Sequence, residues 1–293
     1  MKDRKKQIVA WITTFAITIG LSILTDINVC AASNDFTINK DGVLTAYSGI
    51  GGNVVIPKGV TAIGPKAFAG CSDIQRIEMP NSVIYIEEGA FDSCSGMKEV
   101  QLSNKLTTIK SCAFWGCASL KKIYIPKSVK EIGFSAFANC ESLNGIYLSK
   151  NVTTIGNYAF GYMYYGDYVP VIDYVIMGEN QSVAQTYADK YDISFITKSS
   201  LKTALTNVQK NSGNKLTIKW KKNAKVNGYE IQYSTSSKFT TSKTKKVTIK
   251  SNSKVSHTVK NIMGETNYYV RIRGYRTIAG KKYYSTWGNT KKV

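Results

Sequence analysis

The seven residues Leu120-Lys121-Lys122-Ile123-Tyr124-Ile125-Pro126 decide the fold of the first two thirds of the chain. Successive side chains of a strand point to opposite faces, so the alternation of Ile123, Tyr124 and Ile125 predicts a short strand with its isoleucines inward and Tyr124 outward. Pro126 ends the strand because it has no N–H to donate to a ladder.

The sequence on both sides repeats this unit with a period of 23 residues. Further columns of Val, Ile, Cys and Leu share the period, and an Ala-Phe pair recurs five times without a slip. The phenylalanines of these pairs are Phe68, Phe91, Phe114, Phe137 and Phe160. Recurring apolar positions at such a period predict a solenoid, in which the stacking of small coils creates the core. We expect each Phe to fill the interior of its coil on the return side.

Both ends of the repeats differ from the repeated unit. Residues 36–44 read as a hairpin with Asp41-Gly42 at its turn. After the last Ala-Phe pair, residues 175–178 read as a strand and residues 182–191 as a short helix with Ser182 as N-cap. These segments predict caps at the two ends of the stack.

The repeated unit I-P-x-x-V-x-x-I-G-x-x-A-F-x-x-C-x-x-L and the closing segment 178–188 resemble the BspA-like leucine-rich repeat family of secreted and surface bacterial proteins. The resemblance covers about residues 36–197. It implies an extracellular binding solenoid, since members of the family are associated with adhesion to host or neighbouring cell surfaces. It does not name a ligand.

After Thr197 the period disappears and several short strand-like runs follow, including 216–220 and 229–233. Such a series within about 90 residues predicts a β-sandwich, with Trp220 in its core. Ile262 lies six residues before Tyr268, which is the spacing of a tyrosine corner. The pattern resembles a Lys-rich fibronectin type III module, and this resemblance implies a spacing or adhesive role.

We therefore predict a mainly β protein, with a leucine-rich repeat solenoid followed by a fibronectin type III-like sandwich. The expected segments are a signal peptide at 1–31, an N-terminal cap at 32–55, repeats at 56–170, a C-terminal capping repeat at 171–197 and the sandwich at 198–293.

The first of these segments combines Lys2, Arg4, Lys5 and Lys6 with an apolar run and the small residues around Ala31, which is typical of export. An uncleaved N-terminal anchor is the alternative. No other stretch is apolar enough to span a membrane, so we expect a secreted or cell-surface protein without a transmembrane segment after cleavage. No sortase-type signal closes the chain, so we expect its attachment to be non-covalent, through an uncleaved leader, or absent.

The charge is divided unequally between the two modules. Residues 32–197 hold 13 Lys or Arg and 15 Asp or Glu, whereas residues 198–293 hold 22 Lys or Arg and only two Asp or Glu. The positive electrostatic field of residues 198–293 favours polyanionic partners. Because the chain is expected to be exported, we expect an anionic cell-wall polymer as the partner of this segment. A merely solvated lysine-rich face is the other interpretation. We expect no specific nucleic-acid partner, although extracellular DNA has the matching charge.

Tyrosines supply the candidate ligand-binding residues. Tyr124 and Tyr147 occupy one outward column, where they are expected side by side on an exposed sheet. A tyrosine offers an apolar face and a hydroxyl to a sugar or a protein. The second candidate is an insertion that interrupts the 23-residue repeat. It is expected either to cap the last coil or to form a loop that contacts a ligand. Its tyrosines are Tyr162, Tyr164, Tyr165 and Tyr168.

No residues point to catalysis, a cofactor or a metal. The chain has one histidine, His257, with no acidic partner nearby in the sequence, and six cysteines without C-x-x-C spacing. Four cysteines follow the 23-residue period and predict an internal stack of thiols. These are Cys71, Cys94, Cys117 and Cys140. Cys112 lies outside that column, and a disulfide involving it stays open.

These observations favour a secreted or surface-displayed bacterial binding and adhesion protein. Its solenoid would present a face to an extracellular protein or glycan, and its cationic sandwich would act as a spacer or bind the envelope. The alternatives are the accessory-module portion of a cell-wall-active enzyme and a pure structural spacer.

Overall fold

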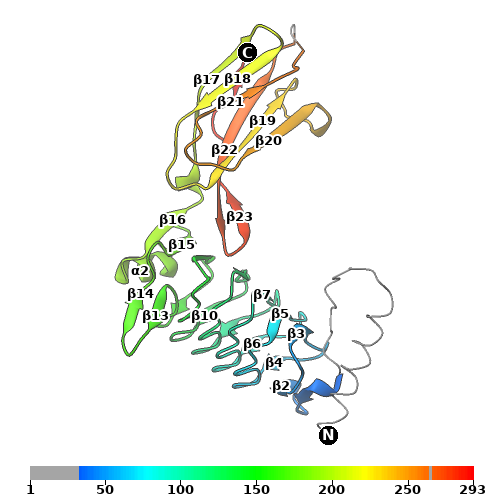
Figure 1. The fold of residues 1–293 in the computed structure, drawn as a ribbon, viewed down its shortest axis with the longest axis vertical. Helices are drawn as coiled ribbons and strands as arrows, with labels where there is room; N and C mark the ends of the chain where they lie inside the picture. The colour runs from blue at the N-terminus through cyan, green and yellow to red at the C-terminus, as the bar shows by residue number, and fades with distance from the viewer. Residues whose placement is uncertain (1–32, 264–265) are drawn as a thin grey trace, which may run out of the picture.

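The computed structural model describes residues 33–263 and 266–293. The chain is mainly β and forms a solenoid followed by a β-sandwich, as the sequence predicted. The solenoid has about seven turns, more than the five copies of the Ala-Phe pair. The two modules lie end to end along the long axis of the molecule (Figure 1). The predicted signal peptide lies outside the described residues.

The N-terminal cap is the hairpin expected at residues 36–44. A short 3-10 helix, η1 (Ser33–Asp35), leads into β1 (Phe36–Ile38), which pairs antiparallel with β2 (Val43–Tyr47). Gly42 takes a φ of 77° in the turn, a backbone region that glycine enters without steric cost. Strand β2 then pairs parallel with the first coil, so the cap continues into the stack.

The coils form two parallel ladders rather than the one that the sequence predicted. The predicted strand builds the first ladder, of β3 (Gly52–Val55), β5 (Ile74–Glu78), β7 (Glu99–Gln101) and β9 (Lys122–Ile123). A column of two-residue strands builds the second, of β4 (Ala62–Ile63), β6 (Tyr85–Ile86), β8 (Thr108–Ile109), β10 (Glu131–Ile132) and β12 (Thr154–Ile155). Two residues are too few to show an alternating pattern, which is why this second ladder was missed.

The five phenylalanines line up in a row through the core, as predicted. Each is at most 2% exposed, and consecutive rings from Phe68 to Phe160 stack 4.9 to 5.1 Å apart. Tyr47 of the cap continues the row at one end and Tyr187 closes it at the other. Within the row, each Phe ring stacks on the Phe rings of the adjacent coils, so the core is built coil by coil.

One position of every coil takes a left-handed backbone conformation. It lies one residue before the Ala-Phe pair and has a φ between 49° and 58°. Its occupants are Lys66, Gly89, Cys112, Ser135 and Tyr158. Only Gly89 adopts such a φ without crowding of Cβ, so the other four coils keep this turn at a cost in backbone strain.

The C-terminal cap starts where the first ladder stops. Strand β11 (Gly145–Tyr147) does not join β9 but forms a separate sheet with β15 (Val175–Gly178) and β16 (Ser194–Thr197). Helix α2 (Val183–Lys190) covers the last coil, with Ser182 as its N-cap as predicted. The tyrosine insertion is a hairpin of β13 (Tyr162–Tyr164) and β14 (Tyr168–Pro170).

The sandwich has two antiparallel sheets, entered through η2 (Ser199–Leu201). The first contains β17 (Leu205–Asn211), β18 (Lys215–Trp220) and β21 (Ser256–Val259). The second contains β19 (Gly228–Ser234), β20 (Thr244–Ile249, after the 3-10 helix η3 at Thr241–Lys243), β22 (Tyr269–Ile278), β23 (Lys281–Tyr284) and β24 (Lys291–Lys292).

Two predicted features of the sandwich are confirmed. Trp220 is 3% exposed and packs against Tyr229 in the core. The hydroxyl of Tyr268 accepts a hydrogen bond from the backbone N–H of Met263 at 3.1 Å, which makes the expected tyrosine corner. No helix among the described residues is long and apolar enough to cross a membrane.

Candidate functional site

The outward side chains of the first ladder form a polar surface on the solenoid. The registers of β5, β7 and β9 place Arg76 beside Glu99 and Glu99 beside Lys122. Lys122 pairs with Glu99 at 3.0 Å, as expected from their alternating charges. Arg76 turns away from Glu99 and contacts Glu78 at 3.5 Å and Gln101 at 3.3 Å. Exposed pairs of this kind add little to stability.

A groove of about 610 Å³ crosses this surface. Its polar lining includes carboxylates, carboxamides and two lysines, and an aromatic ring stands at one end. These side chains are Glu78, Asn81, Glu99, Gln101, Asn104, Lys122, Tyr124 and Lys281. A concave site with several hydrogen-bonding groups and one aromatic face has the composition of a site for a polar ligand.

The second module closes one end of this groove. The turn between β22 and β23 projects toward the solenoid (Figure 1), and its residues Ala279, Gly280 and Lys281 line the groove. Ala279 and Gly280 have φ values of 46° and 81°, which is typical of a two-residue hairpin turn. A Cβ added to Gly280 would lie 2.7 Å from Cγ of Lys122, so the turn approaches the solenoid closely.

The two tyrosines of the predicted outward column both contact the second module. Nζ of Lys281 lies 3.5 Å from the ring centroid of Tyr124. The ring of Tyr283 stacks on that of Tyr147, and the Lys198 ammonium lies over Tyr147 at 5.4 Å. Tyr147 is therefore 7% exposed, whereas the sequence predicted an exposed residue. Tyr124 remains half-buried at the groove.

The electrostatics of this junction follow from its burial. Burial lowers the pKa of Lys281 below its ordinary value, and the neighbouring Lys198 and Lys127 lower it further. Burial also raises the pKa of Tyr147, with smaller contributions from Glu179 and Tyr124. Two other cations thus lie near Lys281, and together with burial they disfavour its charged form.

The tyrosine hairpin β13–β14 combines a packed base with an exposed tip. Tyr168 stacks face to face on Tyr158 with ring centroids 4.0 Å apart, and its hydroxyl lies 2.7 Å from Oγ of the buried Ser135. Tyr162 donates a hydrogen bond to a backbone carbonyl of the cap. Tyr164 and Tyr165 are 44% and 74% exposed. The four predicted residues thus divide into two that hold the hairpin and two that it presents.

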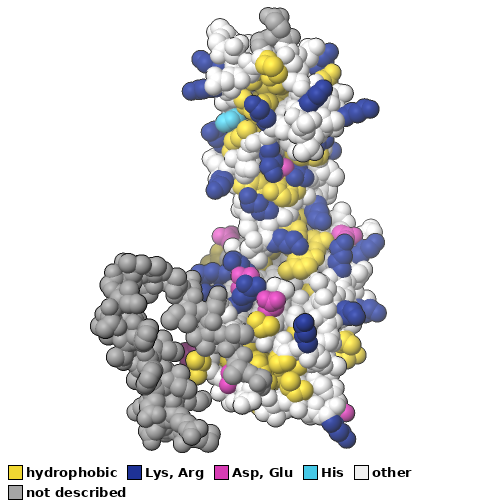
Figure 2. Space-filling view, turned by 90° about the vertical axis from the view of Figure 1, so that its right-hand side faces the viewer, with side chains coloured by type: hydrophobic (Ala, Val, Ile, Leu, Met, Phe, Trp, Pro, Cys, Tyr) yellow, Lys and Arg dark blue, Asp and Glu magenta, His cyan; other side chains and the backbone are white. Residues whose placement is uncertain are grey.

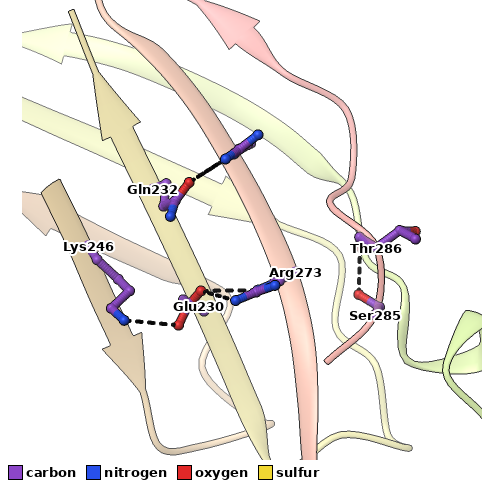
Figure 3. Close-up of polar contacts among 7 residues, drawn as sticks. Glu230, Gln232, Lys246, Arg273, Ser285 and Thr286 are labelled. Carbon is purple, nitrogen blue, oxygen red and sulfur yellow. Dashed lines mark hydrogen bonds and ion pairs between the residues drawn. The ribbon is translucent and has the colours of Figure 1, made fainter. Parts of the chain in front are cut away.

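The second module contains a polar cluster that the sequence did not reveal. Glu230 is 2% exposed and accepts two hydrogen bonds from Arg273, at 2.6 and 3.0 Å, with Lys246 at 3.6 Å (Figure 3). Trp287 packs against the guanidinium groups of Arg271 and Arg273. The Cζ atom of each arginine lies 4.4 Å from the centroid of the Trp287 ring. The sequence signal for this pairing is the alternation of polar with apolar side chains, Glu230 and Gln232 on β19 and Arg271 and Arg273 on β22.

The cysteine column is an interior ladder of thiols. Cys94, Cys117 and Cys140 are buried, and each thiol donates to the carbonyl of a Phe in the preceding coil, at 3.1 to 3.2 Å. Cys71 and Cys112 are partly buried, and all five cysteines that the structure describes are free. Within residues 33–263 and 266–293, no group of three or more His, Cys, Asp or Glu side chains is placed to hold a metal ion.

Comparison with protein families identifies both modules. Residues 49–165 match the model of the BspA type leucine rich repeat region, in six copies, and residues 203–290 match the fibronectin type III domain. Both families are non-catalytic binding or structural modules. Comparison with curated proteins gave no match.

Several solved bacterial structures are similar to the repeat region. A leucine rich repeat protein from T. pallidum is 31% identical with a TM-score of 0.45, over 50% of this chain and 70% of that protein. A leucine rich cell surface protein from Faecalibacterium prausnitzii is 33% identical with a TM-score of 0.37, over 40% and 32%. A leucine-rich repeat protein from Bacteroides ovatus is 29% identical with a TM-score of 0.38, over 48% and 38%. This chain spans about a third of the latter two proteins.

Proposed function

We propose that this chain, which consists of a BspA-type leucine-rich repeat region followed by a fibronectin type III domain, is a secreted surface protein that binds an extracellular ligand on its solenoid. Modules of these two kinds are typical of surface and adhesion proteins that bind other molecules. The expected signal peptide at residues 1–31 supports export, and the lack of any motif for catalysis in the sequence supports a binding role.

The groove is the observation that carries this proposal. Its volume of about 610 Å³ falls within the usual range of ligand sites. Glu78, Gln101 and Asn104 offer hydrogen-bond acceptors and donors along it, and Tyr124 offers an aromatic ring at the end closed by Lys281. Hydroxyl groups of a sugar make hydrogen bonds of this kind, so we propose a short stretch of glycan as its ligand.

A glycan array probed with the full chain tests the groove. The double variant Glu78→Gln with Gln101→Ala replaces one carboxylate of the groove by a neutral carboxamide and removes a second polar side chain. It should lower affinity at least tenfold, since each hydrogen bond to a charged or polar group that is weakened or lost costs about 1 kcal/mol or more. The matched control, Glu88→Gln with Gln209→Ala, changes two side chains that lie away from the groove and should bind like the unchanged protein. Equal binding by both variants would refute the assignment.

The tip of the tyrosine hairpin is a second candidate contact, for a protein ligand. Tyr164 and Tyr165 are exposed at this tip, and two apolar side chains of the same region are exposed as well, Val169 within β14 and Ile172 just after it, the latter 89% exposed. Tyrosine and apolar side chains of this kind are enriched in protein interfaces. Replacing Tyr164 and Tyr165 with Ala should reduce adhesion to a protein-coated surface while the groove variant leaves it unchanged.

The sandwich is proposed to hold the protein to the envelope, or to act as its spacer. Lys and Arg side chains are spread over it, whereas acidic side chains lie mainly on the solenoid (Figure 2). A surface of this charge attracts an anionic wall polymer, and such attraction weakens as salt screens it. Retention on wall material should therefore fall between low and high salt.

A further inference from the structure

A second hollow lies in the sandwich, on the side near the solenoid. It has a volume of about 770 Å³ and is formed by the segment that leaves η2, the loop between β18 and β19, and a residue close to the C-terminus. Its lining includes four lysines that come from two separate segments. These are Lys202, Lys221, Lys222 and Lys225.

None of these four lysines forms an ion pair with a described residue of the chain. All four side chains are exposed. Glu230 is the acidic residue of the sandwich that the structure describes, and it is buried between Arg273 and Lys246. The positive charge around the hollow is therefore not compensated within this module.

The two lysine-bearing segments are fixed to each other by hydrogen bonds. The side-chain amide of Asn223 donates to the carbonyls of Ser200 and Lys202, at 2.9 and 3.0 Å. The hydroxyl of Thr203 donates to the carbonyl of Lys221 at 2.6 Å. The backbone N–H of Asn223 donates to the hydroxyl of the buried Tyr229. The lysines thus project from a rigid frame, which reduces the conformational entropy that binding would cost.

We propose that this hollow binds consecutive phosphate groups of a polyol phosphodiester polymer. A lysine ammonium is a compact charge that suits a phosphate oxygen, and four of them around one hollow can engage more than one phosphate. The lining contains no aromatic side chain, so it offers no surface on which a nucleic-acid base could stack. This observation favours a polymer without bases over a nucleic acid.

The proposal rests on the proposed envelope-binding role of the sandwich and is independent of the glycan groove. It assigns that role to one site rather than to the total charge of the module. A matched set of lysines at the opposite end of the sandwich makes the distinction measurable. Lys215 begins β18, whereas Lys221 follows its end. Lys260 follows β21, whose last residue, Val259, pairs with Leu216 of β18. Lys243 ends η3 and Lys245 lies in β20, which pairs with the far end of β19.

The experiment measures binding of a soluble glycerol phosphate oligomer to the full chain by calorimetry at two salt concentrations. The site variant changes Lys202, Lys221, Lys222 and Lys225 to Gln. The control variant changes Lys215, Lys243, Lys245 and Lys260 to Gln, so both lose the same charge. All eight side chains are exposed, and circular dichroism melts of each variant check that it folds.

We expect the site variant to lose at least tenfold in affinity and to show a weaker dependence on salt, because fewer counterions are released. The control variant should lose less than threefold, and the groove variant Glu78→Gln with Gln101→Ala should lose nothing. Equal losses in the site and control variants would mean that only total charge matters. A single-stranded DNA oligomer of equal charge that bound as tightly as the glycerol phosphate oligomer would also overturn the proposal, as would absence of binding by the unchanged protein.

Discussion

The ring of Tyr283, from the sandwich, stacks on the ring of Tyr147, from the solenoid, with centroids 4.7 Å apart and planes inclined by 20°. This contact lies next to the break between β9 and β11, where the first ladder of the solenoid stops. Both rings are at most 7% exposed. The two modules are therefore joined by a packed aromatic contact in addition to the chain that connects them.

Tyr283→Ala should release this junction while both modules stay folded. Loss of a buried aromatic ring costs about 3 kcal/mol or more, and here most of that cost falls on the contact between the modules. Small-angle scattering of the full chain should show a broader distribution of distances than in the unchanged protein. Tyr283→Phe keeps the ring and should leave the distribution unchanged; if both variants scatter alike, the stack does not fix the junction.

Phe114→Ala should destabilise the solenoid more than any change at the ends of the Phe row. Phe114 stacks on Phe91 and Phe137, and the variant leaves a cavity in the middle of the row. The expected loss in the free energy of unfolding is about 3–5 kcal/mol, measured by urea denaturation. Phe114→Leu fills part of the space and should cost less. A loss below about 1 kcal/mol for the Ala variant would contradict a continuous core.

Lys66→Gly should stabilise the protein. Lys66 is exposed and takes a φ of 54°, so the change relieves left-handed strain without removing a buried group. The gain expected in the free energy of unfolding is about 0.5–1 kcal/mol, net of the entropy that glycine adds to the unfolded chain. Lys58→Gly, at an exposed position without a positive φ, is the control and should be neutral or destabilising.

The buried thiols should make the solenoid less stable in alkali. Burial raises the pKa of Cys94 and of Cys140 to about 12, from an ordinary value of 9.0. A group whose pKa is raised in the folded state contributes its full stabilisation to the folded protein at pH values below its unfolded pKa. This stabilisation is lost as the pH rises toward the folded pKa. The urea midpoint should therefore fall between pH 9 and about 12.

Replacing Cys94, Cys117 and Cys140 with Ala should make this fall shallower, because the remaining alkaline titration comes from other groups. Labelling with iodoacetamide at neutral pH gives an independent check. The partly buried Cys71 and Cys112 should react in the folded protein, whereas the three buried thiols should react only after unfolding. An unchanged pH dependence in the triple variant would exclude the thiols as its source.

The sequence was sufficient for the parts of the fold that a local pattern determines. The 23-residue period placed Phe68 to Phe160 in one row, and the Ser182 N-cap and the Tyr268 corner were recognised from residue types at fixed spacings. The left-handed column escaped notice because glycine occupies it only at Gly89. A turn that four other residue types tolerate leaves no compositional signal.

The candidate site was predicted only in part, for a different reason. Tyr124 and Tyr147 belong to the column that the sequence predicted, but the sandwich covers Tyr147 and contributes Lys281 to the groove. The lysine hollow likewise joins Lys202 to a loop that lies beyond the next two strands, β17 and β18. These contacts join the solenoid to the sandwich, or distant segments of the sandwich to each other, and they depend on tertiary packing. Neither the 23-residue repeat of the solenoid nor the strand alternation of the sandwich encodes such packing.

The row of stacked phenylalanines has a consequence for how such genes can evolve. Because each coil meets only the coil before and after it, unequal recombination that inserts or deletes one whole unit of 23 residues would leave both caps and the junction at Tyr147 intact. Each such event would shift the N-terminal end by about 4.8 Å, the spacing of neighbouring strands. The solenoid can thus change its length in discrete increments while both of its caps stay the same.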